Sequence, residues 1–303
     1  MFYESTNSVW PVLLTPFKED GKIDYDSLKS LICWYEENGV GGLFAVCQSS
    51  EMFFLSLRER VELTAFIKKT AHVPVISSGH ISYDLDDQVD ELQRISDAGA
   101  DAVIMITNRL AGVDDSDAVW RKSLDYLMKK LPQNIPLGFY ECPYPYKRLI
   151  RDDELKYCAE SGRFFFLKDT CCDAELIRHR LELLKDTRLK LYNANTATLL
   201  ETLTYGAAGF SGVMANFHPE LYVWLCKNWK TQPQKAERLQ ALLTMCAQIE
   251  RQLYPVNAKT FLQSKKLIAS NRCRSKNCHE MSSLFLKEVE QMEILTSWFE
   301  GTL

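Results

Sequence analysis

The chain has 303 residues, of which 46% are hydrophobic and 25% are charged, as in ordinary globular proteins. Its net charge of -4, without a long block of one sign, argues against a nucleic-acid-binding surface or a basic membrane-binding face. No apolar stretch approaches the roughly 18 residues of a membrane span. Residues 1–5 show no basic region leading into an apolar run, so we expect no signal peptide and a cytoplasmic protein with ten reduced cysteines.

Short apolar runs alternate with amphipathic stretches over most of the chain. The runs predict strands near residues 10–14, 42–47, 74–78, 102–106, 136–140, 164–168, 189–193 and 208–213. The stretches between them predict helices near residues 25–37, 57–69, 84–98, 117–130, 152–161, 175–184, 196–205 and 219–229. Strands that are apolar throughout are buried on both faces, as in a parallel sheet. Eight such units predict a (β/α)8 TIM barrel. A doubly wound sheet is the alternative, but no glycine-rich dinucleotide loop follows the first strand.

The alternation stops after residue 229. Residues 231–253, 255–269 and 280–299 predict helices with no strand between them. We therefore expect a barrel over residues 1–229 and a C-terminal helical appendage over residues 230–303. The apolar stripe of each of these helices must be covered by the barrel or by a neighbouring subunit.

Catalytic groups of such a barrel lie at the C-terminal ends of the strands and in the loops that follow. The sixth predicted strand ends in Lys168, which brings one amine from an apolar interior to the barrel mouth. Burial favours the neutral amine, which can attack a ketone and form a Schiff base. From this segment alone, the alternative is a lysine that reaches water or pairs with Asp169.

Three other strand ends carry groups that suit a site for a small acid. The fifth strand ends in Tyr140, a proton donor and acceptor, or else a tyrosine at the edge of the core. Gln48, Ser49 and Ser50 follow the second strand, and a polar loop of this kind can hold a carboxylate. Ser211 ends the eighth strand beside small residues, which permit close approach of a ligand or tight packing.

These strand ends, taken in order, resemble the N-acetylneuraminate lyase / dihydrodipicolinate synthase family of pyruvate-dependent class I aldolases. The resemblance covers residues 8–265. Its motifs are Val12-Leu13-Leu14-Thr15-Pro16-Phe17 in the opening strand, Cys47-Gln48-Ser49-Ser50-Glu51 on the G-[ST]-T-G-E loop, Tyr140-Glu141-Cys142-Pro143 on Y-N-x-P, Leu167-Lys168-Asp169-Thr170 on the Schiff-base strand, and Gly209 to Asn216 on the strand-eight segment.

The resemblance implies roles for these residues. Lys168 is expected to form a Schiff base with pyruvate or another 2-oxo acid, and Tyr140 to shuttle a proton. Ser49, with the backbone N–H groups of Ser49 and Ser50, is expected to hold the substrate carboxylate. Gln48 is expected to contribute a hydrogen bond, and the Ser211 carbonyl to orient the bound acid. The resemblance implies no cofactor, no metal, and a homodimer or homotetramer.

The chain departs from the family pattern in several places. Cys47 replaces the loop glycine, and Gln48 replaces a hydroxyl residue, so it cannot relay a proton. The loop at residues 107–112 lacks the tyrosine of the synthase subgroup. Pro145 stands where that subgroup has a carboxylate-binding arginine, for which Lys147 or Arg148 is a candidate replacement. These departures argue against a lysine-biosynthesis synthase, and the loops at residues 171–173 and 193–195 argue against sialic acid cleavage.

The expected activity is therefore reversible carbon–carbon cleavage of an unidentified 2-oxo acid. The alternatives are a Schiff-base dehydratase of a keto-deoxy sugar acid and a non-catalytic barrel that binds a keto acid.

Glu141 and Arg109 are either specificity residues or solvated loop charges. His80 is a candidate substrate contact, whereas His218 is expected to be structural. Cys273, Cys278 and His279 lack the spacing of a zinc site.

Overall fold

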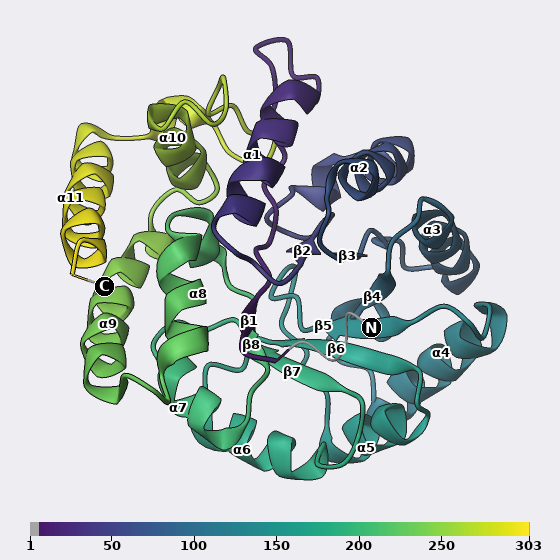
Figure 1. Ribbon diagram of the computed structural model, residues 1–303. Coiled ribbons are helices and arrows are strands. Elements are labelled where there is room, and N and C mark those ends of the chain that lie inside the picture. Colours follow the sequence, from purple (N-terminus) through teal and green to yellow (C-terminus); the bar gives the residue numbers. More distant parts are fainter. Residues whose placement is uncertain (1–5, 303) are drawn as a thin grey trace.

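The computed structural model describes residues 6–302, so residues 1–5, which carry the signal-peptide prediction, lie outside it. Eight parallel strands form the centre, and helices surround them (Figure 1). The strand order is β1-β8-β7-β6-β5-β4-β3-β2, in which β2 to β8 lie in chain order and β1 pairs with β8. A parallel bridge between Val12 and Phe44 joins the segment after β1 to β2. The prediction of a (β/α)8 TIM barrel is confirmed.

The strands and helices follow the predicted alternation. The strands are β1 (Ser8–Val9), β2 (Leu43–Phe44), β3 (Val75–Ser77), β4 (Ala102–Ile106), β5 (Leu137–Tyr140), β6 (Phe164–Asp169), β7 (Lys190–Asn193) and β8 (Gly209–Phe210). The helices around them are α1 (Tyr25–Glu37), α2 (Leu57–Thr70), α3 (Leu85–Asp97), α4 (Asp117–Lys130), α5 (Asp152–Glu160), α6 (Ala174–Leu183), α7 (Leu199–Tyr205) and α8 (Pro219–Asn228).

The first strand differs from its prediction, because regular pairing covers Ser8–Val9 rather than residues 10–14. Pro11 has no backbone N–H, so it interrupts the hydrogen-bond ladder. The predicted run still follows the sheet, since Trp10 N donates to Phe210 O at 2.8 Å. The strand therefore continues irregularly toward the barrel mouth.

Aromatic side chains fill the barrel interior below its mouth. The rings of Phe166 and Tyr192 stack with centroids 4.5 Å apart, and Trp10 meets Phe166 edge-on at 5.4 Å. Alternate residues of a strand share a face, so Lys168 stands above Phe166 on the inner face of β6. The aromatic side chains of the barrel interior therefore lie directly below Lys168.

A buried ion-pair network fixes the outer faces of β5 and β6. Glu141 and Asp169 directly follow Tyr140 and Lys168, so the strand alternation turns their side chains outward. Arg180 of α6 pairs with Glu141 at 2.9 Å and also contacts the Asp169 carboxylate. All three side chains are at most 1% exposed. This network, which we call the Arg180 network, attaches α6 to the two strand ends that carry the candidate catalytic residues.

The C-terminal helices lie together beside α1 and α8 (Figure 1). They are α9 (Pro233–Cys246), α10 (Val256–Ser264) and α11 (Ser283–Glu300), and a 3-10 helix, η5 (Ala247–Arg251), extends α9. The helix predicted over residues 231–253 is thus shorter, and the chain turns before Pro255. The start of the appendage at residue 230 stays a prediction.

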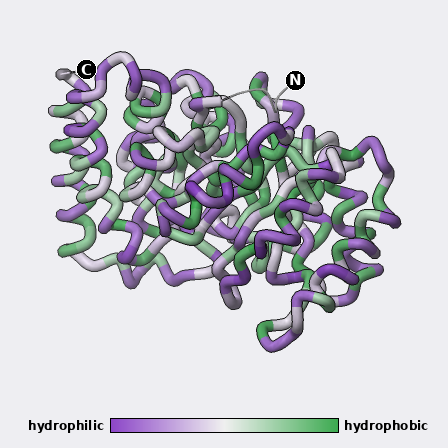
Figure 2. The backbone as a smooth tube through the Cα atoms, turned by 90° about the horizontal axis from the view of Figure 1, so that it is seen from below, coloured by the Kyte–Doolittle hydropathy of each residue, from purple (hydrophilic) through white to green (hydrophobic). Residues whose placement is uncertain are grey.

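Helix α11 stands at the edge of the molecule, with polar and apolar residues mixed along its length (Figure 2). Ile294 and Trp298 are among its exposed apolar side chains. Within residues 6–302, no helix combines the length and apolar character needed to cross a membrane.

Replacing Arg180 with methionine is expected to lower the free energy of unfolding by about 3–5 kcal/mol, because two buried carboxylates lose their counter-cation. Urea denaturation measures the change. Arg178→Met is the matched control, since Arg178 lies on the same helix with a side chain 51% exposed. Its change should stay below about 1 kcal/mol. Equal losses for the two variants would contradict the structural role of the Arg180 network.

Candidate active site

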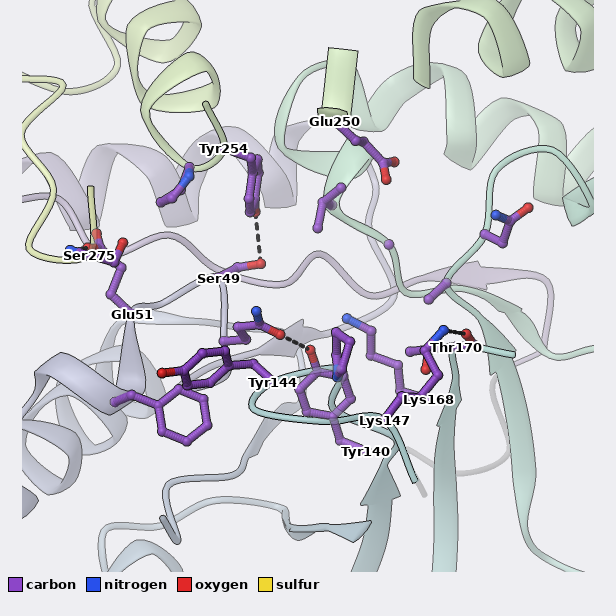
Figure 3. A pocket seen from close by; sticks show the side chains of 18 of the residues that line it. Ser49, Glu51, Tyr140, Tyr144, Lys147, Lys168, Thr170, Glu250, Tyr254 and Ser275 are labelled. Atoms are coloured by element: carbon purple, nitrogen blue, oxygen red, sulfur yellow. Dashed lines mark hydrogen bonds between the residues drawn. The ribbon is translucent and has the colours of Figure 1, made fainter. Parts of the chain in front are cut away.

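A cavity of about 580 Å³ opens at the C-terminal ends of the strands (Figure 3). Loops after β2, β5, β6, β7 and β8 line it, together with residues of the C-terminal segment. Among the predicted site residues, Lys168, Tyr140, Gln48 and Ser49 line the cavity. Ser50 and Ser211 are buried and do not belong to its lining.

The Lys168 side chain is only 3% exposed, and its amine forms no hydrogen bond or ion pair with residues 6–302. The amine lies 4.6 Å from the centroid of the Tyr140 ring. Burial lowers the pKa of Lys168, and the negative forms of Cys47, Cys142 and Glu250 oppose that shift. Asp169, the alternative partner, points outward to Arg180. The amine is therefore easier to deprotonate than that of a solvated lysine.

Tyr140 supplies a phenol beside this amine. Its hydroxyl donates to Gln48 Oε1 at 3.3 Å, and the Cys142 thiol donates to the same oxygen at 3.5 Å. Burial raises the pKa of Tyr140 well above 10, so the phenol keeps its proton at neutral pH. The Gln48 amide fixes the direction of that proton but cannot pass it on.

The loop after β2 presents donors suited to a carboxylate. The backbone N–H groups of Gln48 and Ser49 donate to no acceptor within the described chain. Ser50 differs from its prediction, since its N–H donates to Cys47 O at 3.1 Å and its hydroxyl to Leu13 O at 2.6 Å. Ser50 therefore holds the loop together, and Gln48 and Ser49 carry the available donors.

Ser211 lies below the cavity surface. Its hydroxyl donates to Trp10 O and its N–H to Asn193 O, both at 2.9 Å. The next two residues, Gly212 and Val213, form the cavity wall instead. The orienting role of the Ser211 carbonyl stays a prediction.

Tyr254 is a site residue that the sequence analysis missed. Its hydroxyl donates to Ser49 Oγ at 2.8 Å (Figure 3) and accepts a hydrogen bond from Asn216 Nδ2 at 3.2 Å. Burial raises the pKa of Tyr254 well above 10, so it remains a donor. Tyr254 therefore orients the Ser49 hydroxyl. The one available signal was Pro255, which ends the preceding predicted helix.

Glu250 of η5 is a second missed residue, and it faces Lys168 across the cavity (Figure 3). Its carboxylate forms no hydrogen bond or ion pair with residues 6–302. Burial raises the pKa of Glu250 to about 7, although the positive charge of Lys168 opposes the shift. The cavity thus holds a carboxyl group that changes charge near neutral pH.

Glu51 attaches the β2 loop to the C-terminal appendage. Its Oε1 pairs with the Lys259 amine of α10 at 2.6 Å, and both side chains are buried. Its Oε2 accepts from the backbone N–H groups of Arg274 and Ser275 at 2.7 and 2.6 Å. This pairing places Ser275 and Lys276 at the rim of the cavity.

Glu141 and Arg109 were interpreted from the sequence as specificity residues or as solvated loop charges, and their positions in the structure match neither interpretation. Glu141 belongs to the Arg180 network and is fully buried. Arg109 is 6% exposed, and its guanidinium stacks over the rings of Phe53 and Tyr83 at 5.1 and 4.6 Å. Neither residue lines the cavity.

The two candidate histidines are buried outside the cavity lining, and only one of the two candidate replacements for the arginine lines the cavity. His80 is buried away from the cavity, and burial lowers its pKa to about 3. His218 is also buried, stacked 5.7 Å from the Tyr222 ring, which agrees with a structural role.

Lys147 lines the cavity, and its amine donates to Thr170 O at 2.7 Å. Arg148 instead pairs with Asp117 outside the cavity.

A TIM barrel with a lysine amine buried at the mouth, beside a phenol, is the arrangement of a lyase of the class I aldolase type. Comparison with known proteins agrees, since a model of the Dihydrodipicolinate synthetase family matches residues 5–280. The chain therefore belongs to the dihydrodipicolinate synthetase family.

Individual relatives are distant. The 4-hydroxy-tetrahydrodipicolinate synthase of Methanothrix thermoacetophila is 23% identical, over 86% of this chain and 83% of its own length. The enzyme of the same name from Haloarcula marismortui is 28% identical, over 71% of this chain and 69% of its own length. The solved 4-hydroxy-tetrahydrodipicolinate synthase from Methylacidiphilum fumariolicum shares the fold, with a TM-score of 0.86, 18% identity and 97% coverage of both chains.

Glu250→Gln is expected to stabilise the protein more at pH 8 than at pH 5. The folded protein holds the Glu250 pKa near 7, above its ordinary value of 4.5, so the wild type loses stability as pH rises between these values. Glutamine cannot ionise and escapes that loss, by roughly 1–3 kcal/mol. Urea denaturation of both proteins at the two pH values measures the difference. A difference independent of pH would show that Glu250 is solvated.

Proposed function

We propose that this protein is a Schiff-base-forming class I aldolase that makes or cleaves a carbon–carbon bond at C3 of pyruvate or of a related 2-oxo acid. The observation that carries the proposal is the Lys168 amine, which is buried at the end of β6, has no hydrogen-bond or ion-pair partner in the described chain and faces the cavity. Such an amine reacts readily with a ketone.

Binding of the 2-oxo acid would begin at the β2 loop. The free N–H groups of Gln48 and Ser49 and the Ser49 hydroxyl, oriented by Tyr254, suit its carboxylate. Lys168 then attacks the ketone carbon to give a carbinolamine, which loses water to become an iminium ion. The iminium ion withdraws electrons, so C3 loses a proton and an enamine forms. The enamine carbon attacks an aldehyde, and water later hydrolyses the iminium to release the product and the free lysine.

Tyr140 would handle the protons of these steps. Its phenol is protonated at neutral pH and lies beside the amine. It donates its proton to the carbinolamine hydroxyl as that group leaves as water, and the resulting phenolate takes the proton that C3 loses. The restored phenol then donates to the aldehyde oxygen as the new bond forms. In the cleavage direction the phenolate left after water loss removes the proton from the substrate hydroxyl, and the restored phenol then protonates C3 of the enamine.

The activity in the relatives' names, 4-hydroxy-tetrahydrodipicolinate synthesis, is not the activity that we propose. Residues 107–112 contain no tyrosine, and no arginine lines the cavity within the described chain. A dehydratase would instead keep the carbon skeleton intact, so product analysis separates it from an aldolase. We further propose a cytoplasmic homodimer or homotetramer.

Incubation with pyruvate and borohydride is expected to add a reduced adduct to Lys168, seen by intact mass and located by peptide mapping. The buried amine forms the imine, and borohydride reduces the imine to a secondary amine that does not hydrolyse. Lys168→Ala should give no adduct at the site, whereas Lys156→Met, a change at an exposed lysine on α5, should leave it in place. Absence of an adduct with pyruvate and with other 2-oxo acids would overturn the proposal.

Tyr140→Phe is expected to lower aldol turnover by roughly 10²–10⁴-fold, the usual contribution of a positioned acid–base group. The adduct on Lys168 should still form, but more slowly, because water loss from the carbinolamine also uses the phenol. Steady-state rates and the time course of trapping measure the two effects. Tyr205→Phe, outside the cavity on α7, is the control. Wild-type turnover in Tyr140→Phe would remove Tyr140 from the mechanism.

A further inference from the structure

We propose that Glu250 selects the second substrate, binding the hydroxyl groups of an uncharged hydroxylated aldehyde and disfavouring an aldehyde that carries a carboxylate. This inference rests on the proposed aldolase function and assigns Glu250 as a specificity-determining residue. Its basis is the position of Glu250, its lack of protein partners, and the charges of the surrounding cavity.

Glu250 occupies the side of the cavity opposite the reacting amine. It enters from η5 in the appendage, whereas Lys168 and Tyr140 enter from the barrel strands (Figure 3). The oxo acid is expected to bind between Lys168 and the β2 loop, where the free N–H groups of Gln48 and Ser49 lie. The aldehyde must approach from the remaining space, which Glu250 lines.

The Glu250 carboxylate has hydrogen-bonding capacity that the protein leaves unused. Within residues 6–302 no donor reaches it, and its burial is sufficient to raise its pKa. A partly buried carboxylate without donors is destabilising, and a ligand hydroxyl that donates to it removes this penalty. A second carboxylate brought to the same place would add charge repulsion.

The cavity also lacks the groups that would hold an anionic aldehyde. A carboxylate is best recognised by a bidentate arginine, and within residues 6–302 no arginine belongs to the lining. Arg148 pairs with Asp117, and Arg109 is buried against aromatic rings. Two lysines reach the rim, but the Lys147 amine already donates to Thr170 O, and Lys276 is exposed to solvent. Of the two glutamates that line the cavity in the described chain, Glu51 is paired with Lys259, so Glu250 is the one without a counter-cation.

The test compares two aldehydes that differ in one group, glyceraldehyde with a CH2OH and tartronate semialdehyde with a carboxylate. Each is combined with pyruvate, and kcat/KM is divided by the fraction of each preparation that borohydride traps. The wild type should prefer glyceraldehyde by at least about tenfold, the scale of a hydrogen bond to a charged group. Glu250→Gln should reduce that preference about tenfold, and Glu250→Leu should also weaken the use of glyceraldehyde. Glu290→Gln, an exposed change on α11, should keep the wild-type ratio.

The outcomes separate this inference from the function on which it rests. A ratio that stays within about twofold in Glu250→Gln, in a protein that still traps pyruvate, overturns the role of Glu250 alone. A wild-type preference for tartronate semialdehyde overturns it as well. A wild-type protein that traps no 2-oxo acid overturns the proposed function, and this inference with it.

Discussion

The Arg180 network is the constraint on which the site depends. Its carboxylates, Glu141 and Asp169, are the sequence neighbours of Tyr140 and Lys168. Adjacent residues of a strand point to opposite faces, so holding these carboxylates outward holds the phenol and the amine inward. The network also removes the nearest counter-ion from Lys168. An amine that lacks a salt-bridge partner in an apolar setting has a lowered pKa, and its nucleophilic form is accessible.

The appendage completes the site. Glu51, in the loop proposed to bind the carboxylate, pairs with Lys259 and accepts hydrogen bonds from the backbone N–H groups of residues 274 and 275. The same appendage supplies Tyr254, which orients Ser49, and Glu250, which faces Lys168. The barrel therefore provides the proposed covalent chemistry, while the appendage lines the part of the cavity that we propose for the second substrate. Breaking a buried pair such as Glu51–Lys259 is destabilising because it leaves an uncompensated charge, which couples the loop to the stability of the appendage.

The barrel and its two central residues could be predicted from the sequence because their signals are local. Buried parallel strands are apolar throughout, and their ends mark the mouth, so Lys168 and Tyr140 could be placed there, whereas their proposed roles came from the family resemblance. Contacts between distant residues could not be predicted. Tyr254 and Ser49 are 205 residues apart in the chain, and Glu250 lay inside a stretch that looked continuously helical. The tight turn that uses the Ser50 N–H within the loop is likewise a detail that the residue type does not reveal.

The central claim is that Lys168 converts a 2-oxo acid into an enamine, and proton exchange at C3 tests it without any knowledge of the aldehyde. Pyruvate is incubated with the protein in deuterated water, and its methyl signal is followed by proton NMR. The account predicts that the wild type exchanges these protons well above the buffer rate and that Lys168→Ala does not. Exchange at the buffer rate in the wild type, or undiminished exchange in Lys168→Ala, would contradict the account.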